Sequence, residues 1–214
     1  MLLHGVPTDT VAVLRRVSSL ARNWGAQFAA TRLLSAGSSI EHRDRSLRVI
    51  PAPGHSPTDT LFLDEARGIL FGGDHLLAEI SSNALISRDL ANTSASGRFA
   101  RRRALVEYMA SLQATRELEI GLVLGGHGPP FSDHRALIDK RLARYEERAE
   151  QILAIVRERT RSAHEITDVI WGEIAITDAF LTLSEVLGHV DLLIADELVV
   201  EHRRASGSVA YGRG

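Results

Sequence analysis

The sequence predicts an α+β protein of two domains, and two features of its pattern lead to this prediction. Over residues 1–133, short apolar segments of strand character alternate with helical segments, and glycine-rich or polar residues follow the strands. Residues 134–214 begin with a long helical repeat and continue with two shorter helices and a hairpin. We therefore expect a sheet-containing domain over 1–133, and a long linking helix with a small second domain over 134–214.

The composition is typical of a folded, water-soluble protein. Of 214 residues, 44% are hydrophobic and 24% are charged, and the formal net charge of -2 gives no overall field that would gather nucleic acid or an anionic membrane. The chain has no cysteine, so any metal site must use His, Asp or Glu. No apolar run approaches the roughly 20 residues that span a bilayer. These features predict a cytoplasmic protein without membrane association.

The first domain is expected to contain two helices and four strands. Val13, Val17, Leu20 and Trp24 recur at helical spacing and predict an amphipathic helix over residues 8–24. The other expected elements are strands over 47–50, 60–63, 69–71 and 120–124, with the second and third forming a hairpin, and a helix over 98–115 that buries Leu105, Tyr108, Met109 and Leu112.

The second domain begins with a long helix that Ser132 or Asp133 can cap and that extends to about Arg159. Its apolar positions recur at three- and four-residue steps: Ile138, Leu142, Tyr145, Ala149, Ile152 and Val156. Helices over 165–171 and 178–196 follow, and then strands over 198–202 and 208–211. This order of two helices and a basic hairpin predicts a winged-helix domain.

Three metal-capable side chains stand in loops at strand ends. His55 lies in Pro53-Gly54-His55-Ser56-Pro57, where proline and glycine restrict the backbone and present the imidazole at a defined angle. Asp74 follows an apolar strand, where a carboxylate is costly to bury unless it is paired or bound to a cation. His127 lies in Gly125-Gly126-His127-Gly128-Pro129, at the end of another strand. Alone, each could be a turn or cap residue, but their joint occurrence in this order predicts a metal site.

At these motifs the sequence resembles the metallo-β-lactamase superfamily, and more narrowly its glyoxalase II-like members with a C-terminal winged helix. The resemblance implies a partial αββα sandwich followed by a winged-helix domain. It also implies two zinc or similar divalent ions around a bridging hydroxide, with His55 on the first ion, Asp74 between the two as a catalytic and bridging residue, and His127 on the second. His75 is expected as a further catalytic residue that supports the site or faces the substrate, with a structural role as the alternative. His134 and His164 are expected to be solvent-exposed surface residues.

One motif of that superfamily is absent between Met1 and Pro53. The His-x-His-x-Asp-His sequence, which supplies further metal ligands, has no match there; His4 stands alone, and His42 lies in a polar turn with the wrong spacing. We therefore expect at most partial metal occupancy in this chain. Two interpretations stay open: an N-terminally shortened form of a longer enzyme, which we favour, or a protein that is not a competent hydrolase.

The resemblance implies hydrolysis of a small acyl ester or thioester. An RNA-cleaving enzyme is one alternative, because His202, Arg203, Arg204 and Arg213 place positive charge on the predicted wing, although the same charges can simply protect an exposed strand edge. A non-catalytic dimerisation or regulatory module is the other. A homodimer is compatible with all three hypotheses.

Overall fold

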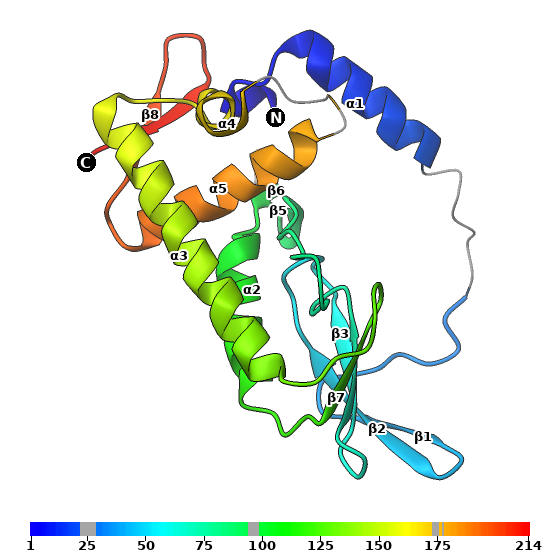
Figure 1. Cartoon of the computed structure of the whole chain (residues 1–214). Helices are drawn as coiled ribbons and strands as arrows, with labels where there is room; N and C mark the ends of the chain where they lie inside the picture. Colours follow the sequence, from blue (N-terminus) through cyan, green and yellow to red (C-terminus); the bar gives the residue numbers. More distant parts are fainter. Residues whose placement is uncertain (22–28, 94–98, 173–175, 177) are drawn as a thin grey trace. The chain divides into compact units, whose positions relative to one another are not determined.

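The computed structural model describes residues 1–21, 29–93, 99–172, 176 and 178–214 (Figure 1), and it separates into two compact units. The sheet unit comprises Arg32–Glu146, and the second unit comprises Met1–Thr31 together with Glu147–Gly214. The predicted boundary lies between residues 133 and 134, whereas these units divide between residues 31 and 32 and again between residues 146 and 147. The N-terminal helix belongs with the C-terminal elements, and the first half of the long helix belongs with the sheet.

The sheet unit is built on a five-stranded mixed sheet with the order β1-β2-β3-β4-β7. Its first four strands pair antiparallel, whereas β4 and β7 pair parallel. The predicted β3–β4 hairpin is present, and β1 is an additional strand that its polar sequence did not reveal. The strands are β1 (Ser39–His42), β2 (Arg45–Pro51), β3 (Thr60–Asp64), β4 (Ile69–Gly73) and β7 (Leu122–Gly125).

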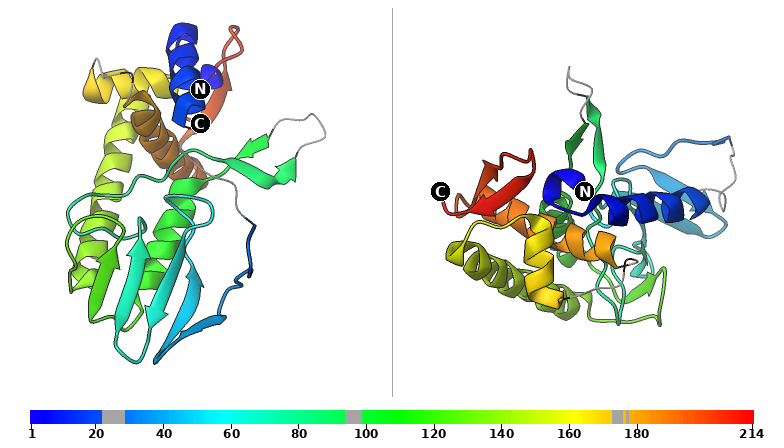
Figure 2. Two further views of the ribbon diagram at one scale, coloured as in Figure 1. Left: turned by 90° about the vertical axis from the view of Figure 1, so that its right-hand side faces the viewer. Right: turned by 90° about the horizontal axis from the view of Figure 1, so that it is seen from above.

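Three strands of this sheet run in the same direction. Because β2 and β4 are both antiparallel to β3, and β7 is parallel to β4, the chain leaves β2, β4 and β7 at one edge of the sheet. The left view of Figure 2 shows the strands of this sheet, with β3 between β2 and β4 and with helix α2 (Ala104–Arg116) behind them. The loops that carry His55, Asp74 and His127 therefore begin at a common edge.

Helix α2 covers the sheet with the apolar residues that its sequence predicts. Leu105, Tyr108 and Leu112 are buried, whereas Met109 is only half-buried. The helix begins later than expected because residues 99–101 form strand β6 (Phe99–Arg101), which pairs with β5 (Arg88–Thr93).

The long helix α3 (His134–Glu158) begins and ends close to its predicted bounds. Asp133 caps it, since Asp133 Oδ1 accepts a hydrogen bond of 3.2 Å from the backbone N–H of Ala136. Ile138 and Tyr145 on its first half are buried in the sheet unit, as the apolar repeat predicts.

The second unit contains the C-terminal elements expected from the sequence. Arg161 forms an antiparallel bridge with Tyr211, so the segment before α4 lies against the terminal hairpin. His4 is buried, and its Nδ1 lies 3.1 Å from the hydroxyl of Tyr211. The elements are η1 (Leu2–His4), α1 (Thr8–Ala21), α4 (Ala163–Trp171), α5 (Ala179–Ala195), β8 (Val200–Arg203) and β9 (Val209–Gly212).

The predicted amphipathic helix is present as α1, but its predicted apolar positions are exposed rather than buried. Val13, Val17 and Leu20 keep 42%, 50% and 60% of their surface accessible. Only Val11, together with Val6 before the helix, is buried. Periodicity identified the helix but not its burial, and Trp24, the fourth residue of the pattern, lies outside the described residues.

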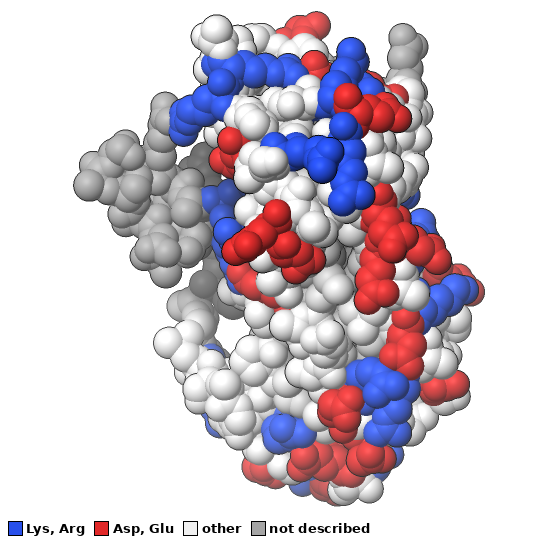
Figure 3. All heavy atoms as spheres, turned by 90° about the vertical axis from the view of Figure 1, so that its left-hand side faces the viewer, with Lys and Arg blue, Asp and Glu red and all other residues white. Residues whose placement is uncertain are grey.

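Basic and acidic side chains are interspersed on the face shown in Figure 3, in agreement with the net charge of -2. None of the helices in the described ranges is both long enough and apolar enough to cross a bilayer.

One residue of the predicted basic wing is engaged in the second unit. Arg204 forms a bidentate ion pair with Glu165, at 2.6 and 3.1 Å. Glu165 also closes a capping box with Ser162 at the start of α4. The hydrogen bonds from Arg204 are the main reason that the pKa of Glu165 falls to about 2. Arg204 therefore fastens the hairpin to α4.

This pKa predicts how acid weakens the second unit. Because the folded-state pKa lies below the ordinary value of 4.5, ionised Glu165 stabilises the fold above about pH 4.5, and this contribution is lost as the pH falls toward 2. We expect Arg204→Met to lower the melting temperature at pH 7, with a deficit that shrinks between pH 4.5 and 3. Thermal melts followed by circular dichroism at pH 7 and between pH 4.5 and 3 measure this difference in melting temperature. Arg203→Met, at an exposed neighbouring position, should show little deficit at any pH; equal deficits for both variants would contradict the assignment.

Candidate metal centre

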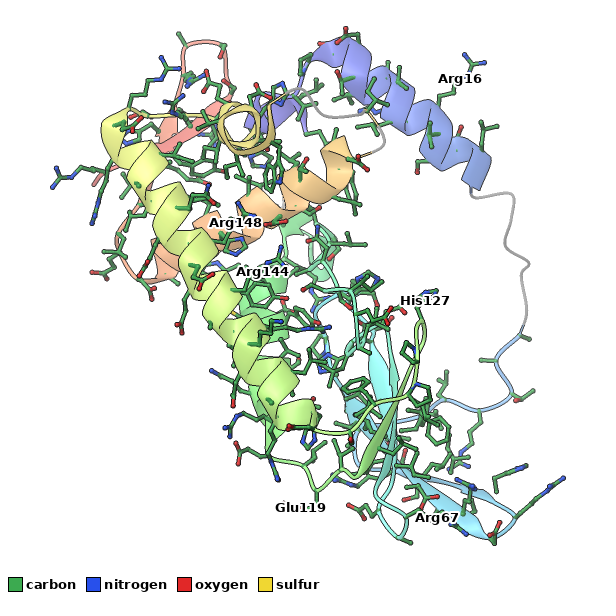
Figure 4. The ribbon with its side chains drawn as sticks, viewed as in Figure 1. Arg16, Arg67, Glu119, His127, Arg144 and Arg148 are labelled. Atoms are coloured by element: carbon green, nitrogen blue, oxygen red, sulfur yellow. The ribbon has the colours of Figure 1, made fainter. Side chains whose placement is uncertain are left out.

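The structure brings the side chains of His55, Asp74 and His127 together at the common edge of the sheet. His55 lies in the loop between β2 and β3, Asp74 follows β4, and His127 follows β7. Figure 4 labels His127 in the loop after β7, with Glu119 before the opposite end of that strand. Because these strands run in the same direction, residues up to 72 positions apart in the chain lie close together.

The Asp74 carboxylate lies between the two imidazoles and presents a different oxygen to each. Asp74 Oδ2 is 3.9 Å from Nε2 of His55, and Oδ1 is 3.4 Å from Nε2 of His127. Ligands of one tetrahedral zinc ion, each about 2.0–2.1 Å from the metal, lie about 3.3 Å from one another. The His127 pair matches that spacing, and the His55 pair is somewhat wider.

The three side chains do not converge on one point. In the described ranges, no group of three or more His, Asp or Glu side chains is arranged around a single metal position. Instead, Oδ2 of Asp74 faces Nε2 of His55, and Oδ1 faces Nε2 of His127. This donor set fits a carboxylate between two neighbouring cations, each of which needs further ligands, better than one cation held by all three residues.

The loop of His55 is fixed by hydrogen bonds that orient its imidazole. The backbone N–H of Ser56 donates to Asp59 Oδ2 at 2.8 Å, and the Ser56 hydroxyl donates to Oδ1 of the same carboxylate. His55 Nδ1 lies 2.9 Å from the carbonyl oxygen of Asn83. Since a carbonyl only accepts, Nδ1 carries the proton, and the lone pair of Nε2 points toward Asp74. This is the orientation that metal-binding histidines adopt.

His75 does not face a substrate in this structure, which corrects that part of the expectation. Its side chain is fully buried, and burial lowers the pKa of His75 to about 4, so the imidazole is neutral at pH 7. Its Nε2 lies 3.0 Å from the hydroxyl oxygen of Thr115, which donates its own hydrogen to the carbonyl of Ser111. His75 Nε2–H is therefore the donor, and His75 connects the Asp74 loop to helix α2.

Helix α2 also supports the other side of the site. The Ser111 hydroxyl donates to the carbonyl of Pro53 at 2.8 Å, and the hydroxyl of Tyr108 donates to the carbonyl of His75 at 2.5 Å. Gly54 lies directly on Tyr108, since a β-carbon at position 54 would overlap the ring. This contact explains why the motif needs glycine beside His55.

Three other histidines can be compared with the sequence predictions, each within its own unit. His134, expected on the surface, is only 3% exposed because it begins α3 at the buried end of the helix, and this corrects the expectation. His164 is half-buried, with Nδ1 3.7 Å from Asp168 Oδ1 one helical turn away. His42 is exposed at the β1–β2 turn, as predicted.

Several supporting residues were not recognised from the sequence. Asp59 had a local signal, because a serine three residues before an aspartate often closes a hydrogen-bonded turn. No sequence signal marks Ser82 or Asn83 as part of the site, or Arg141, described below, as a buried residue. Their roles depend on contacts between distant segments.

The chain is similar to metallo-hydrolases of known sequence or structure, although no protein-family model matches it. It is 29% identical over 198 residues to the probable metallo-hydrolase YqjP of Bacillus subtilis, in a match that covers 92% of this chain and 60% of that protein. A solved β-lactamase domain protein from Burkholderia ambifaria superposes with a TM-score of 0.83 and 28% identity, covering 99% of this chain and 59% of the other.

A second solved structure, the metallo-β-lactamase family protein TTHA1429 from Thermus thermophilus, shares the fold with a TM-score of 0.76 at 24% identity, over all of this chain and 62% of its own. The chain thus spans about 60% of the length of these relatives. The α+β class predicted from the sequence is confirmed. The chain is thus similar in sequence to a probable metallo-hydrolase and in fold to a β-lactamase domain protein and a metallo-β-lactamase family protein.

Proposed function

We propose that the protein is a metal-dependent hydrolase of small acyl thioesters or esters, with His55, Asp74 and His127 as metal ligands. The observation that carries the proposal is the Asp74 carboxylate, each of whose oxygens faces the Nε2 atom of a different histidine. A metal-dependent hydrolase also agrees with the names of the relatives. The substrate class rests only on the resemblance of the Gly72–Leu77 segment to thioester- and ester-cleaving members.

A divalent cation bound at such a site lowers the pKa of a bound water enough for hydrolysis near neutral pH. The chain supplies the positions of the ligands. The Asn83 carbonyl holds His55 in the tautomer that leaves Nε2 available, and the Asp74 carboxylate places a negative charge between the imidazoles that would offset the charge of a bound cation. His127 keeps 69% of its side chain exposed, so a substrate can reach this end of the sheet from solvent. Zinc suits the His and Asp donors, as do other divalent ions.

The alternatives receive less support. An RNA-cleaving enzyme would use the basic wing, but Arg204 is already paired with Glu165. The order of α3, the Arg161 bridge, α4, α5 and the β8–β9 hairpin supports a winged-helix domain. Such a domain serves a hydrolase, a nuclease or a regulatory module equally well. Measurement of the protein's mass in solution would test the predicted homodimer.

Metal binding and hydrolysis by the purified protein test the proposal. We expect zinc or manganese to bind in calorimetry and to promote release of free thiol from short acyl thioesters. Asp74→Asn and a combined His55→Ala and His127→Ala variant should each lose at least about 100-fold in metal affinity, because loss of a supporting residue alone costs 10- to 100-fold. His42→Ala, an exposed histidine of the same unit, is the matched control. Unchanged metal binding by the ligand variants would overturn the proposal, and cleavage of RNA but not thioesters would replace the substrate class.

Gly126 leaves the space that the Asp74 carboxylate occupies. Its backbone N–H donates to the carbonyl of Gly73 at 2.7 Å, so the two loops are held together. A β-carbon at position 126 would lie 2.6 Å from Asp74 Oδ1 and 3.2 Å from the carbonyl carbon of Gly73. Any larger residue at position 126 would therefore displace the Asp74 carboxylate, whereas glycine does not.

Gly126→Ala should move the Asp74 carboxylate away from His127 while leaving the fold intact. We expect metal affinity to fall about 10- to 100-fold, the cost typical of disturbing a group that orients a ligand. A crystal structure of the variant should show the separation of Asp74 Oδ1 and His127 Nε2 widened beyond 3.4 Å. Gly121→Ala, where the added carbon meets nothing closer than 3.7 Å, should change neither. An undisturbed carboxylate in Gly126→Ala would refute this steric argument.

A further inference from the structure

The segment Leu77–Asn83, here called the bridging segment, contacts the loops of His55 and Asp74. At its end, the Asn83 carbonyl accepts the hydrogen bond from His55 Nδ1. One residue earlier, the hydroxyl of Ser82 donates to the backbone carbonyl of Asp74. Beyond the segment, the backbone N–H of Leu85 donates to the carbonyl of His55 at 3.4 Å. The position of this segment therefore determines how His55 and Asp74 are presented to each other.

The beginning of the bridging segment is held by a buried arginine. Arg141, on the first half of α3, is only 5% exposed. Its Nη2 donates to the carbonyl oxygen of Leu77 and to that of Ile80, the latter at 2.7 Å. Farther along, the Ser81 hydroxyl lies 3.3 Å from the hydroxyl of Tyr145, which is also on α3. Helix α3 thus holds the segment along most of its length.

A buried guanidinium is unusual because it is costly to remove from water unless it is paired. Within the described residues, no Asp or Glu forms an ion pair with Arg141, and its hydrogen bonds go to backbone carbonyls of the bridging segment. These hydrogen bonds give a donor to the carbonyl of the buried Leu77 and also hold the carbonyl of the more exposed Ile80. Hydrogen bonds from a charged donor are stronger than those from a neutral one, so they restrict the segment more strongly.

Arg141 also faces the polar group beneath the Asp74 loop. The hydroxyl of Tyr108, which donates to the carbonyl of His75, has a pKa raised mainly by burial, and the positive charge of the nearby Arg141 opposes that rise. Arg141, Tyr108 and Ser82 therefore form one buried polar group behind Asp74 and His75. Displacement of one member disturbs the others.

We infer that Arg141 is a positioning residue for the metal centre: it fixes the bridging segment, which in turn fixes the tautomer of His55 and the backbone of Asp74. The inference rests on the proposed function for its consequence in metal binding, but the effect on His55 is a property of the metal-free protein. Arg141 itself touches neither a ligand nor a reacting atom.

Nitrogen NMR of the metal-free protein tests the first step. In the wild type, the His55 ring should give the pattern of a single tautomer with the proton on Nδ1. In Arg141→Met, which removes both hydrogen bonds, it should give the averaged pattern of two tautomers. Arg141→Lys should fall between them, because a lysine amine can reach one carbonyl but lacks the planar fork.

Cobalt binding tests the second step. The visible spectrum of bound Co²⁺ reports ligand geometry, and we expect Arg141→Met to alter it and to weaken affinity about 10- to 100-fold. Arg135→Met is the matched control, since Arg135 lies on the same helix and also donates to backbone carbonyls, those of Arg116 and Leu118, but next to Glu119 at the opposite end of β7. This control should lose some stability and keep both the His55 tautomer and the cobalt spectrum.

The outcomes separate the two proposals. A folded Arg141→Met protein with the wild-type His55 tautomer and cobalt spectrum would overturn the inference, and so would equal changes in Arg135→Met. If Arg141→Met does not fold, Ser82→Ala removes the contact to Asp74 downstream, and an unchanged cobalt spectrum in that variant overturns the inference as well. Failure of the wild type to bind cobalt would overturn the proposed function, while the tautomer measurement would still decide the role of Arg141.

Discussion

The direction of three strands is the constraint on which the candidate site depends. Strands β2, β4 and β7 all leave the sheet at the same edge, so residues 55, 74 and 127 meet although no local structure connects them. The parallel pairing of β4 with β7 is the decisive part, because it places Gly73 opposite Gly125. Two loops with little side-chain bulk can then approach closely enough for an imidazole to reach the carboxylate.

This edge is supported from behind by elements that contribute no ligand. Helix α2 contacts the loop of His55 through Ser111 and the loop of Asp74 through Tyr108. The bridging segment also joins the same two loops. Rigid helices thus determine the geometry of a site that lies entirely in loops, which is how loop-borne sites achieve defined distances.

The sequence predicted those parts of the molecule that local patterns control. Strands β3 and β4 are apolar runs separated by turn residues, and α3 carries a continuous apolar repeat, so their bounds were close to the observed ones. Strand β1 was not predicted, because Ser39–His42 does not alternate between apolar and polar residues. The apolar positions of α1 predicted a buried face that the structure exposes, since periodicity cannot say whether another element covers it.

The candidate site was predictable only as a set of residues. Glycine and proline around His55 and His127 marked rigid loops. The sequence did not show which of the neighbours Asp74 and His75 is accessible: Asp74 lies at the rim of the site, whereas His75 is buried. Arg141 is surrounded by charged residues of a surface-like helix, so only tertiary contacts reveal it as a buried donor. The metal, the substrate and the dimer stay predictions.

The unequal exposure of the two imidazoles has its own consequence. His55 keeps 26% of its side chain accessible and is hydrogen bonded to the backbone, whereas His127 keeps 69% accessible. Under the proposed function, the two sides of the carboxylate would therefore differ in kinetic lability. A cation beside His127 would exchange with the medium sooner than one beside His55, and mild chelation would leave a protein that retains a single ion on its sheltered side.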